Sequence, residues 1–387
     1  MYQIRTYNAI SVKGLERFPR DSYEVASELP NPEAFMLRSQ KLHDVEFPAS
    51  LMAIGRAGAG VNNVPLNRAS ESGIVVFNAP GANANAVKEL VLAGLLLGSR
   101  DIYQGMKFVD TLEPQDGLDP LLEKEKKRFA GTELRGKTLG VVGLGNIGSL
   151  VANMGLSLGM DVVGFDPAIS VEAAWRLSSQ VQKMDNLVNV FSKCDYISLH
   201  LPALEATRGL INENLFASTK KGCVLLNFAR GEIVDKMAML QALEDGILHR
   251  YVCDFPANET LGNPKVLQMP HIGASTAEAE ENCAIMVADQ LMEFLENGNI
   301  RNSVNFPQIE LGRTTDYRLT ITNRNVPKVL GQITAIFAEY ELNIVDMLNK
   351  SRDNIAYNII DLDEKPSDAV IEALRACEDV INLRVIS

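Results

Sequence analysis

The chain has 387 residues, of which 46% are hydrophobic and 22% charged, a composition that is ordinary for a globular protein and excludes a disordered one. Its 37 Lys and Arg stand against 49 Asp and Glu, which gives a formal charge of −12 and argues against nucleic acid as a partner, since binding a phosphate backbone needs a basic field. At roughly 150 residues per domain, the length predicts two or three domains.

We expect a cytoplasmic protein with no membrane partner. The longest apolar stretch, around Leu90–Leu97, is too short to cross a bilayer, and the first residues lack the basic and then apolar pattern of a signal peptide. The five cysteines never form a Cys-x-x-Cys pair, which favours reduced thiols and predicts neither a disulfide frame nor a metal site.

In the first 90 residues, short apolar strands alternate with helical stretches. Strands are predicted at Met36–Arg38, Leu51–Gly55 and Ile74–Asn78, with a helix at Val61–Ser70 between the last two. Because helices separate the strands, we expect parallel pairing with crossover connections. An apolar helix is predicted from Asn85 to about Arg100, followed by a polar, charge-rich stretch over residues 110–128 that we interpret as a solvated loop with a short helix.

The middle of the chain predicts a doubly wound α/β sheet of about six parallel strands. Near-continuous apolar runs are typical of parallel strands covered by helices on both faces. The predicted strands are Thr138–Gly143, Met160–Asp166, Tyr196–His200, Cys223–Asn227, Arg250–Asp254 and Val266–Met269. Ser275 with Glu278 forms a capping-box pattern that opens a helix ending at Asn297-Gly298.

Residues 299–316 are irregular and polar and are predicted to be a linker. The last 70 residues or so follow the order strand, helix, strand, strand, helix, strand, which is the ferredoxin-like arrangement. This unit holds no nucleophile and base that could act together, so a regulatory or assembly role is favoured over catalysis.

A dinucleotide site is predicted where the strand Thr138–Gly143 meets the next helix. The glycines Gly143, Gly145 and Gly148 form a G-x-G-x-x-G motif that permits a tight turn, a close approach of pyrophosphate, and close packing of helix on strand. The phosphates would face the free N–H groups of a helix that begins near Ile147. Asp166, 23 residues beyond Gly143, suits the adenosine ribose and would repel a 2′-phosphate, so we expect NAD rather than NADP.

Elimination among the four histidines selects His271 as the acid/base. His43 and His249 are interpreted as surface residues, and His200 as a packing or cofactor-wall residue without a nearby acidic partner. His271 follows an apolar strand and precedes a capped helix, at the sheet edge where ligands bind.

Two further side chains complete the predicted reacting centre. An imidazole that exchanges a proton near neutrality needs a carboxylate to orient it and to stabilise its cation. Glu259, on the loop after the preceding strand, is the candidate. Arg230 follows the strand Cys223–Asn227, and its planar guanidinium suits a bidentate grip on a hydroxy-acid carboxylate. Base, orienting carboxylate and anchor thus come from successive strand ends.

These motifs, in the order GLGNIG, Asp166, Phe228-Ala-Arg230-Gly, Asp254-Phe-Pro-x-x-Glu259 and Pro-His271-Ile-Gly-Ala-Ser, resemble the D-isomer-specific 2-hydroxyacid dehydrogenase family over about residues 1–308. The resemblance implies that Arg230 binds substrate, that His271 is the general acid/base, and that Glu259 pairs with it. It also implies two Rossmann- or flavodoxin-like domains, with the substrate-binding domain at residues 1–90 and 278–308 and the NAD-binding domain at 91–277. The implied cofactor contacts are Gly143, Gly145, Asn146, Ile147, Gly148, Asp166, Phe228, Ala229, Arg230, Asp254 and Gly273.

The segment IGRAGAGVNN is similar to the substrate loop of family members that act on a phosphorylated 2-hydroxy acid. The similarity implies carboxylate binding at the backbone of Ala57 and Gly58, with Arg56 as the partner of the substrate phosphate. Arg38 and Ser39 could assist.

Residues 316–387 resemble an ACT domain, which implies an amino-acid effector with contacts at Asn325 and Asn343, or a module that only dimerises. Lys328 stands after Pro327, where glycine is usual in such domains. We expect a homodimer or homotetramer.

The reaction expected from this resemblance is NAD-dependent oxidation of a phosphorylated D-2-hydroxy acid in amino-acid biosynthesis. Two alternatives stay open. One is a dehydrogenase or reductase for another acid of the class, such as hydroxypyruvate or 2-oxoglutarate, which substrate competition would distinguish. The other is an NAD-sensing binding protein, which measured turnover would exclude.

Overall fold

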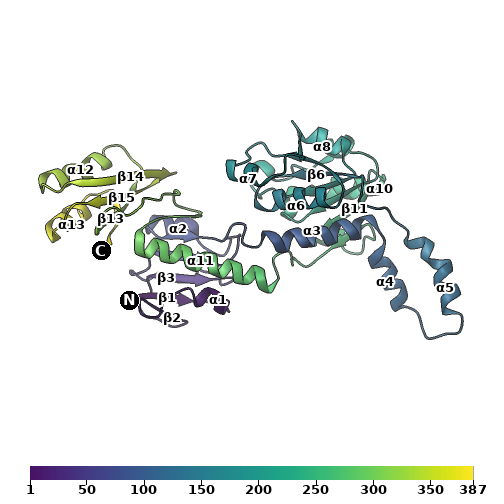
Figure 1. Ribbon diagram of the computed structural model, residues 1–387, viewed down its shortest axis with the longest axis horizontal. Coiled ribbons are helices and arrows are strands. Elements are labelled where there is room, and N and C mark those ends of the chain that lie inside the picture. The colour runs from purple at the N-terminus through teal and green to yellow at the C-terminus, as the bar shows by residue number, and fades with distance from the viewer. Residues whose placement is uncertain (387) are drawn as a thin grey trace. The chain divides into compact units, whose positions relative to one another are not determined.

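The computed structural model describes residues 1–386, and its internal contacts divide the chain into two compact units. One unit comprises residues 1–83 together with the chain from Ala277 onward, and the other comprises Ala84–Thr276. Figure 1 labels the elements of both units, which are described separately below.

The N-terminal part of the first unit is a parallel sheet of five strands in the order β2-β1-β3-β4-β5. The strands and their connecting helices are β1 (Tyr2–Thr6), α1 (Val12–Leu15), β2 (Tyr23–Ala26), β3 (Ala34–Leu37), β4 (Ala53–Arg56), α2 (Leu66–Glu71) and β5 (Val75–Phe77). The predicted strands and parallel pairing are confirmed. The sequence prediction lacked β1 and β2, in each of which a single residue is buried, Ile4 and Tyr23 respectively.

Helix α11 (Ala277–Asn297) packs on this sheet and supplies much of its core. A Cβ on Gly55 of β4 would lie 2.4 Å from Val287 Cγ1, so the helix approaches the strand more closely than any larger residue would permit. The polypeptide therefore returns to the first unit as one long helix fixed against the strand that ends in Arg56.

The second unit contains a parallel sheet of seven strands in the order β12-β11-β10-β9-β6-β7-β8, covered by helices on both faces. Its strands are β6 (Thr138–Val142), β7 (Asp161–Phe165), β8 (Gln182–Lys183), β9 (Tyr196–Leu199), β10 (Cys223–Asn227), β11 (Leu248–Cys253) and β12 (Val266–Gln268). The helices are α3 (Ala84–Ser99), α6 (Asn146–Ser157), α7 (Val171–Arg176), α8 (Leu187–Lys193), α9 (Glu213–Ala217) and α10 (Lys236–Glu244). The doubly wound class is confirmed, and the strand missed by the prediction is the exposed two-residue β8.

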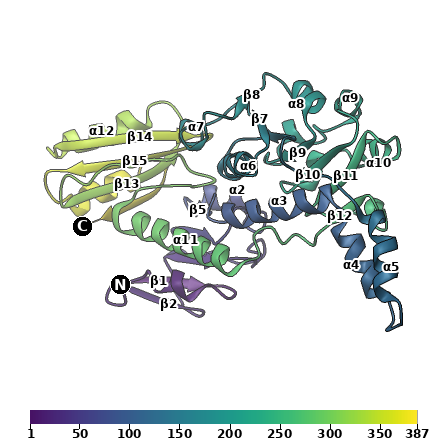
Figure 2. The same ribbon diagram turned by 45° about the vertical axis from the view of Figure 1, so that its right-hand side comes forward.

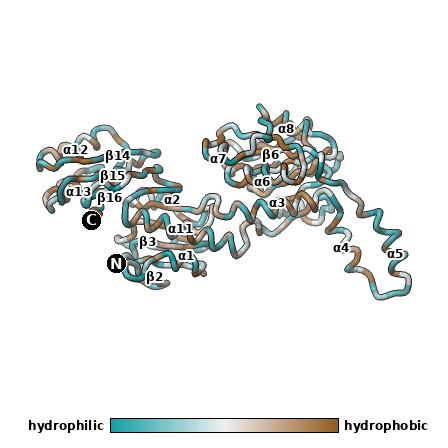
Figure 3. Tube along the Cα trace, in the orientation of Figure 1, coloured by the Kyte–Doolittle hydropathy of each residue, from teal (hydrophilic) through white to brown (hydrophobic). Residues whose placement is uncertain are grey.

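The order of this sheet reverses between β6 and β9, which are neighbours although β7 and β8 lie between them in the sequence. Ligands of doubly wound sheets bind beyond the carboxyl ends of the strands at such a switch point. Figure 3 shows how hydrophobic residues concentrate in the strands around β6. The sheet thus offers its binding edge at the glycine motif.

Helices α4 (Ile102–Asp110) and α5 (Leu118–Glu125) extend away from the seven-stranded sheet as an arm, which both ribbon views show (Figures 1 and 2). Residues 110–128, predicted to be a solvated loop with a short helix, contain α5, and α4 lies just before them and was not predicted. Neither helix contains a buried residue. Even the apolar side chains of Met106 and Val109 are 64% and 53% exposed.

The C-terminal part of the first unit is an antiparallel sheet of four strands in the order β14-β15-β13-β16. Its elements are β13 (Tyr317–Arg324), α12 (Val329–Glu339), β14 (Ile344–Arg352), β15 (Ile355–Leu362), α13 (Asp368–Arg375) and β16 (Val380–Ile386), which confirms the predicted order. The helices α12 and α13 share a core cluster with this sheet through Ile333, Phe337 and Leu374.

This sheet also binds the C-terminal end of α11. The Arg318 guanidinium and the Asp361 carboxylate form an ion pair in which neither side chain is exposed. Tyr357 donates its hydroxyl hydrogen to the Gly298 carbonyl at 2.9 Å, and Arg384 donates to two carbonyls in the last turn of α11. Carbonyls at a helix end have no partner within the helix, so the sheet satisfies groups that would otherwise stay unpaired.

In the part of the chain that the structure describes, no helix combines the length and the apolar character that crossing a membrane requires.

Candidate active site

The glycine motif forms the turn between β6 and α6. Gly143 has a φ of +89°, in the left-handed region that favours glycine. A Cβ on Gly148 would lie 1.8 Å from the Gly143 carbonyl oxygen, so helix and turn approach too closely for any side chain. A Cβ on Gly145 would meet no atom of the chain within 4 Å. The space beside Gly145, at the N-terminus of a helix of 12 residues, fits a pyrophosphate.

Asp166 lies directly beside this turn, after β7. Its two carboxylate oxygens accept the backbone N–H groups of Leu144 at 2.8 Å and Ala168 at 2.9 Å. These bonds fix the carboxylate at the turn, and its remaining lone pairs suit ribose hydroxyl groups. The residues present therefore fit the adenosine half of NAD.

Arg176, which the sequence analysis did not select, also belongs to this site. Its Nη1 donates to Asn146 Oδ1 at 3.0 Å, across 30 positions of sequence. The bond brings a cation from the end of α7 to the first residue of α6. The signal in the sequence was only an arginine ten positions after Asp166, which no local pattern connects to the glycine motif.

The turn after β10 is held by Asn227, which is fully buried. Its Nδ2 donates to the Arg230 carbonyl at 2.9 Å and to the Tyr251 hydroxyl at 3.1 Å, while its Oδ1 accepts the N–H of Ala229. The Phe228–Arg230 backbone is thereby fixed at the sheet edge. Arg230 is half-buried, and its Nη1 donates to the Ala229 carbonyl at 2.6 Å.

Asp254 fixes the turn that carries His271. The Asp254 side chain is buried, and its two oxygens accept the N–H groups of Ile272 at 2.9 Å and Gly273 at 2.7 Å. His271 precedes these residues and has a φ of +58°, while its ring packs against Phe255 in a tilted arrangement, with 4.9 Å between centroids and 55° between the ring planes. A buried carboxylate that receives backbone donors holds the chain firmly, so the imidazole has a defined place at the strand end.

Three neighbouring strands supply these residues. Arg230 follows β10, Asp254 follows β11 and His271 follows β12, and the strands pair in that order in parallel. The carboxyl ends of parallel strands lie along one edge, so the structure places all three residues on the edge that also carries the glycine turn.

Glu259 lies in the short helical turn at Asn258–Thr260 and is exposed. Its carboxylate lies 3.6 Å from Lys236 Nζ, and no hydrogen bond joins it to His271 within residues 1–386. Its own backbone N–H and the Lys236 cation lower the pKa of Glu259 below the ordinary value. The carboxylate is thus ionised at neutral pH, with an exposed lysine as its partner.

His200 directly follows β9, next to the glycine turn. Its Nε2 is hydrogen-bonded to Ser198 Oγ at 2.8 Å, and its Nδ1 is buried without a partner among the described residues. Burial lowers the pKa of His200 to about 3. His200 therefore stays neutral at physiological pH and cannot cycle a proton there.

The predicted substrate residues lie together in the first unit, where β3 and β4 end. Arg56 Nε donates to the Arg38 carbonyl at 3.1 Å, and a Cβ on Gly58 would overlap the Arg56 guanidinium. Arg38 forms an ion pair with Glu280 of α11 at 2.7 Å. The N–H of Ser39 donates to Asn8 Oδ1 at 3.1 Å. The structure therefore brings two cations and the glycine loop to one strand edge.

The predicted effector residues lie on loops of the four-stranded sheet. Asn325 donates from Nδ2 to the Asp353 carbonyl at 3.0 Å, and Asn343 donates its N–H to Asp363 Oδ1 at 3.3 Å. Lys328, three residues after Asn325, has a φ of +81°. That conformation explains why glycine suits this position in a domain of this type.

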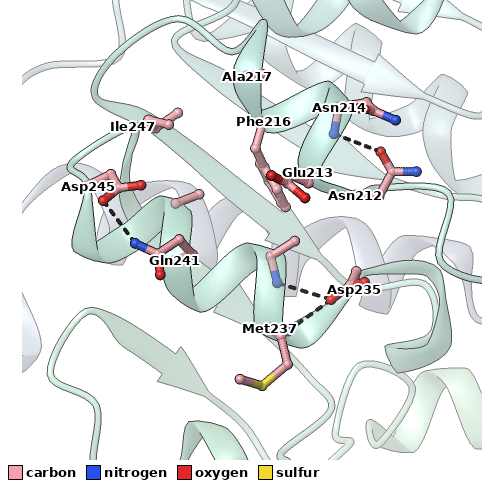
Figure 4. A pocket seen from close by; sticks show the side chains of 12 residues that line it. Asn212, Glu213, Asn214, Phe216, Ala217, Asp235, Met237, Gln241, Asp245 and Ile247 are labelled. Atoms are coloured by element: carbon pink, nitrogen blue, oxygen red, sulfur yellow. Dashed lines mark hydrogen bonds between the residues drawn. The ribbon is translucent and has the colours of Figure 1, made fainter.

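A cavity of about 700 Å³ lies on the second unit between α9 and α10 (Figure 4). Its polar side chains mostly stabilise the two helices: Asn212 and Asp235 accept N–H groups at the starts of α9 and α10, and Gln241 donates to Asp245. These are helix-end contacts on a face of the sheet, so we do not assign the active site to this cavity.

Comparison with protein families gives two matches. A family described as D-isomer specific 2-hydroxyacid dehydrogenase, NAD binding domain, matches residues 93–275, and one described as ACT domain matches residues 317–379. Both the resemblance drawn from the motifs and the expectation of NAD are confirmed.

Three of the similar curated proteins are named D-3-phosphoglycerate dehydrogenase. A D-3-phosphoglycerate dehydrogenase of Haemophilus influenzae is 36% identical over an alignment 354 residues long, which covers 88% of this chain and 83% of the relative. Those of Archaeoglobus fulgidus and Homo sapiens are 35% and 38% identical over 81% and 73% of this chain. The chain spans only 58% and 52% of the lengths of these two relatives.

Solved structures agree on the fold. The NAD⁺-bound 3-phosphoglycerate dehydrogenase of Entamoeba histolytica has a TM-score of 0.62 at 25% identity, covering 80% of this chain and 99% of that one. A holo D-mandelate dehydrogenase of Rhodotorula graminis reaches a TM-score of 0.67 at 23% identity, again over 80% and 99%, and shows the shared fold alone.

Proposed function

Because the chain belongs to the D-isomer-specific 2-hydroxyacid dehydrogenase family, we propose that it oxidises D-3-phosphoglycerate to 3-phosphohydroxypyruvate with NAD, in the biosynthesis of serine. The observation that carries this proposal is the 36% identity to the Haemophilus influenzae D-3-phosphoglycerate dehydrogenase over 88% of the chain. The strand-end residues of the second unit supply the chemistry that this reaction needs.

NAD, when bound, supplies a nicotinamide ring that accepts a hydride. Within this chain, the α6 N-terminus and the space beside Gly145 hold the pyrophosphate, and Asp166 accepts the hydroxyl hydrogens of the adenosine ribose. Asp166 also repels a 2′-phosphate, which favours NAD over NADP. Arg176, bonded to Asn146, adds positive charge at the same helix end.

His271 takes the proton of the C2 hydroxyl as the substrate is oxidised. Arg230 grips the substrate carboxylate and polarises the carbonyl oxygen that forms. The backbone bonds of Asp254 keep the His271 turn in place, and Phe255 packs against the imidazole ring. Glu259 stabilises the imidazolium of His271. To do so, the Glu259 carboxylate leaves Lys236, and this costs little because an ion pair between two half-exposed side chains at 3.6 Å is weak.

Arg56 and Arg38 bind the substrate phosphate, and the loop at Ala57 and Gly58 approaches the carboxylate. A dianionic phosphate competes with Glu280 for Arg38, because a guanidinium binds a phosphate through two parallel hydrogen bonds. The phosphate thus selects this substrate from unphosphorylated hydroxy acids.

A panel of substrates with NAD tests the proposal. D-3-phosphoglycerate should be oxidised with a higher kcat/KM than D-glycerate, and NADH should reduce hydroxypyruvate and 2-oxoglutarate less efficiently than 3-phosphohydroxypyruvate. Arg56→Gln should raise KM for the phosphorylated substrate about 10- to 100-fold and leave D-glycerate unaffected, while the exposed Arg375→Gln changes neither. Equal rates for phosphorylated and unphosphorylated acids would refute the substrate. NAD binding without any turnover would indicate a sensing protein.

His271→Ala tests the assignment of the acid/base. It should lower kcat by about a hundred- to ten-thousandfold with little change in the Kd for NAD. Turnover that survives this substitution would remove His271 from the mechanism.

We also propose a homodimer that is formed through the helical arm. Three large side chains with apolar surface, Tyr103, Met106 and Val109, are exposed along α4. In Figure 3 the tube of α4 alternates between hydrophobic and hydrophilic colours. A second copy of the chain would cover this stripe. Sedimentation of the Met106→Glu variant should then show a smaller species than the wild type, and an unchanged sedimentation coefficient would contradict the arm as the interface.

The remaining proposals concern domains, effector and cell compartment. We propose a substrate-binding domain at residues 1–90 and 278–308, an NAD-binding domain at 91–277 and an ACT domain at 316–387. The chain passes from one compact unit to the other after Asn83 and returns after Thr276, which supports the bounds of the substrate-binding and NAD-binding domains. We propose that Asn325 and Asn343 contact an amino-acid effector and that the protein works in the cytoplasm.

A further inference from the structure

Residues 38–40 directly follow β3, at the edge of the five-stranded sheet where β4 ends in Arg56. Side chains from three other places in the chain bind two N–H groups and two carbonyls of this segment. Backbone near the surface can bond to water instead, so these side chains are not needed merely to satisfy polar groups. They fix the segment in one position.

Asn63 binds this segment from the far end of the loop that begins at Arg56. Its Nδ2 donates to the Gln40 carbonyl at 2.7 Å and to the Arg38 carbonyl at 3.2 Å. Its own carbonyl also accepts the N–H of Leu42 at 2.9 Å. One half-buried side chain therefore ties the segment that carries Arg38 to the loop after β4.

Asn8 holds the same segment from the other neighbouring strand. It follows β1, which pairs with β3 on the side away from β4. Its Oδ1 accepts the N–H groups of Ser39 at 3.1 Å and Gln40 at 2.7 Å. Its φ of +66° lies in the left-handed region, which asparagine adopts more readily than most residues. The segment is thus held between the ends of β1 and β4.

Both arginines that we propose bind the substrate phosphate depend on this segment. Arg56 Nε donates to the Arg38 carbonyl at 3.1 Å, so the guanidinium of one arginine lies on the backbone of the other. Burial raises the pKa of the Cys283 thiol, and the charges of Arg56 and Arg38 oppose that rise, so both guanidiniums lie near the same part of α11. The Arg38 side chain is 39% exposed and reaches Glu280 at 2.7 Å, so burial does not determine where its guanidinium lies. The position of the Arg38 backbone therefore decides how far apart the two cations are.

A phosphate binds two guanidiniums through directed hydrogen bonds, so their spacing must match its oxygens. Groups that are already held in the bound geometry bind more tightly, because less freedom is lost on binding. We propose that Asn63 is a positioning residue for the phosphorylated substrate: by holding the Arg38 backbone against Arg56, it sets the spacing of the two cations. The inference rests on the proposed function, in which both arginines bind the phosphate.

The loop that approaches the substrate carboxylate has supports of its own. The N–H of Ala57 donates to the Leu37 carbonyl at 2.7 Å, and Asn78 Nδ2 donates to the Ala59 carbonyl at 2.6 Å. Neither bond involves Asn63. A change at Asn63 should therefore weaken the grip on the phosphate and leave the binding of the carboxylate in place.

Reduction of 3-phosphohydroxypyruvate and of hydroxypyruvate by NADH tests the proposal, measured as the ratio of the two kcat/KM values. Asn63→Asp keeps the size of the side chain but replaces its donor by an oxygen that only accepts. The ratio should fall about tenfold, through a higher KM for the phosphorylated acid, as expected for lost hydrogen bonds. Asn62→Asp is the matched control. Asn62 is exposed, and its side chain makes no hydrogen bond within residues 1–386, so this variant adds the same charge and should leave the ratio within about twofold.

Two further variants show how Asn63 acts. In an Arg38→Gln background, Asn63→Asp should change the ratio less than about twofold, because the cation that Asn63 positions is gone. Asn8→Gly removes the acceptor on the other side of the segment, while glycine adopts a φ of +66° without strain, and it should lower the ratio in the same way. A merely structural loss would lower both kcat/KM values together and leave the ratio unchanged.

A fall of about threefold or more in Asn63→Asp, absent from Asn62→Asp and from the Arg38→Gln background, supports the positioning role. A smaller fall, an equal fall in Asn62→Asp, or an equal effect without Arg38 overturns it. If thermal melting shows that Asn63→Asp does not fold, the fall in Asn8→Gly decides by the same threshold. A wild-type chain that does not prefer the phosphorylated acid would refute the proposed function itself, which is an outcome distinct from these.

Discussion

Replacing Arg318 with methionine should destabilise the junction between the four-stranded sheet and α11. Arg318 Nε and Nη2 donate to the two Asp361 oxygens at 2.6 and 2.8 Å, and neither side chain is exposed. Removing one partner of such a buried pair costs about 3–5 kcal/mol, because the other charge stays buried and uncompensated. Nη1 also donates to the carbonyls of Asn297 and Leu311, and these would lose their partner. We therefore expect a loss of about 5 kcal/mol.

Urea unfolding followed by far-UV circular dichroism measures this loss. The Arg318→Met variant should lower the midpoint of the transition that includes the four-stranded sheet, whereas Arg375→Met, on an exposed turn of α13, should not. The double variant Arg318→Met, Asp361→Leu should regain part of the stability, since no unpaired charge remains in it. A loss below about 1 kcal/mol for Arg318→Met would refute the reasoning, because it would mean that the pair is hydrated.

The same pair predicts an acid dependence. Burial by itself would raise the pKa of Asp361, but hydrogen bonds from Arg318 and Thr314 outweigh it and hold the pKa below the ordinary value. Near pH 4 the unfolded chain therefore binds a proton that the folded chain does not. This contribution to stability is complete above that range and is lost as the pH falls through the folded pKa. Asp361→Asn should abolish this part of the acid dependence, and an unchanged profile would contradict the assignment.

Three further outcomes are expected. Arg176→Gln should weaken NAD binding about tenfold. Quenching of the fluorescence of Trp175, which is 85% exposed and the single tryptophan of the chain, measures the Kd, and an unchanged Kd would contradict a contact between Arg176 and NAD. Gly148→Ala should abolish NAD binding, since its Cβ would lie 1.8 Å from the Gly143 oxygen, and an intact Kd in the same titration would contradict this. Because the pKa of His200 is about 3, stability should fall as the pH drops from about 6.5 toward 3, and His200→Gln should remove that loss in acid unfolding.

The dinucleotide half of the second unit could be predicted because its signals are local. A strand, three glycines at fixed spacing and a helix follow one another without interruption. A short run of sequence therefore predicts both the turn at Gly143 and the close approach of Gly148 to the Gly143 carbonyl. The order of apolar runs also predicts parallel strands, because such runs need helices on both faces. Strands with a single buried residue, such as β1 and β2, give no such signal.

The supports of the reacting centre were harder to predict, because they act across strands. Asp254 was expected at the cofactor, yet its oxygens receive the N–H groups of Ile272 and Gly273, 18 and 19 positions later. Asn227 looks like the polar end of an apolar strand, and only the turn it bonds reveals its role. The partner of Glu259 also depends on tertiary placement, because Lys236 comes from another element.

The junction at α11 gave no sequence signal, because a buried arginine in a strand cannot be told from an exposed one by pattern. The junction matters because α11 is long: its 21 residues at about 1.5 Å each span about 30 Å. Near its start Glu280 holds Arg38, and its last turn accepts hydrogen bonds from Arg384 of the four-stranded sheet. Since α11 packs against β4 with no space for a side chain on Gly55, a shift of the four-stranded sheet must either break its bonds to α11 or move the helix that holds Arg38, the arginine that we propose binds the substrate phosphate.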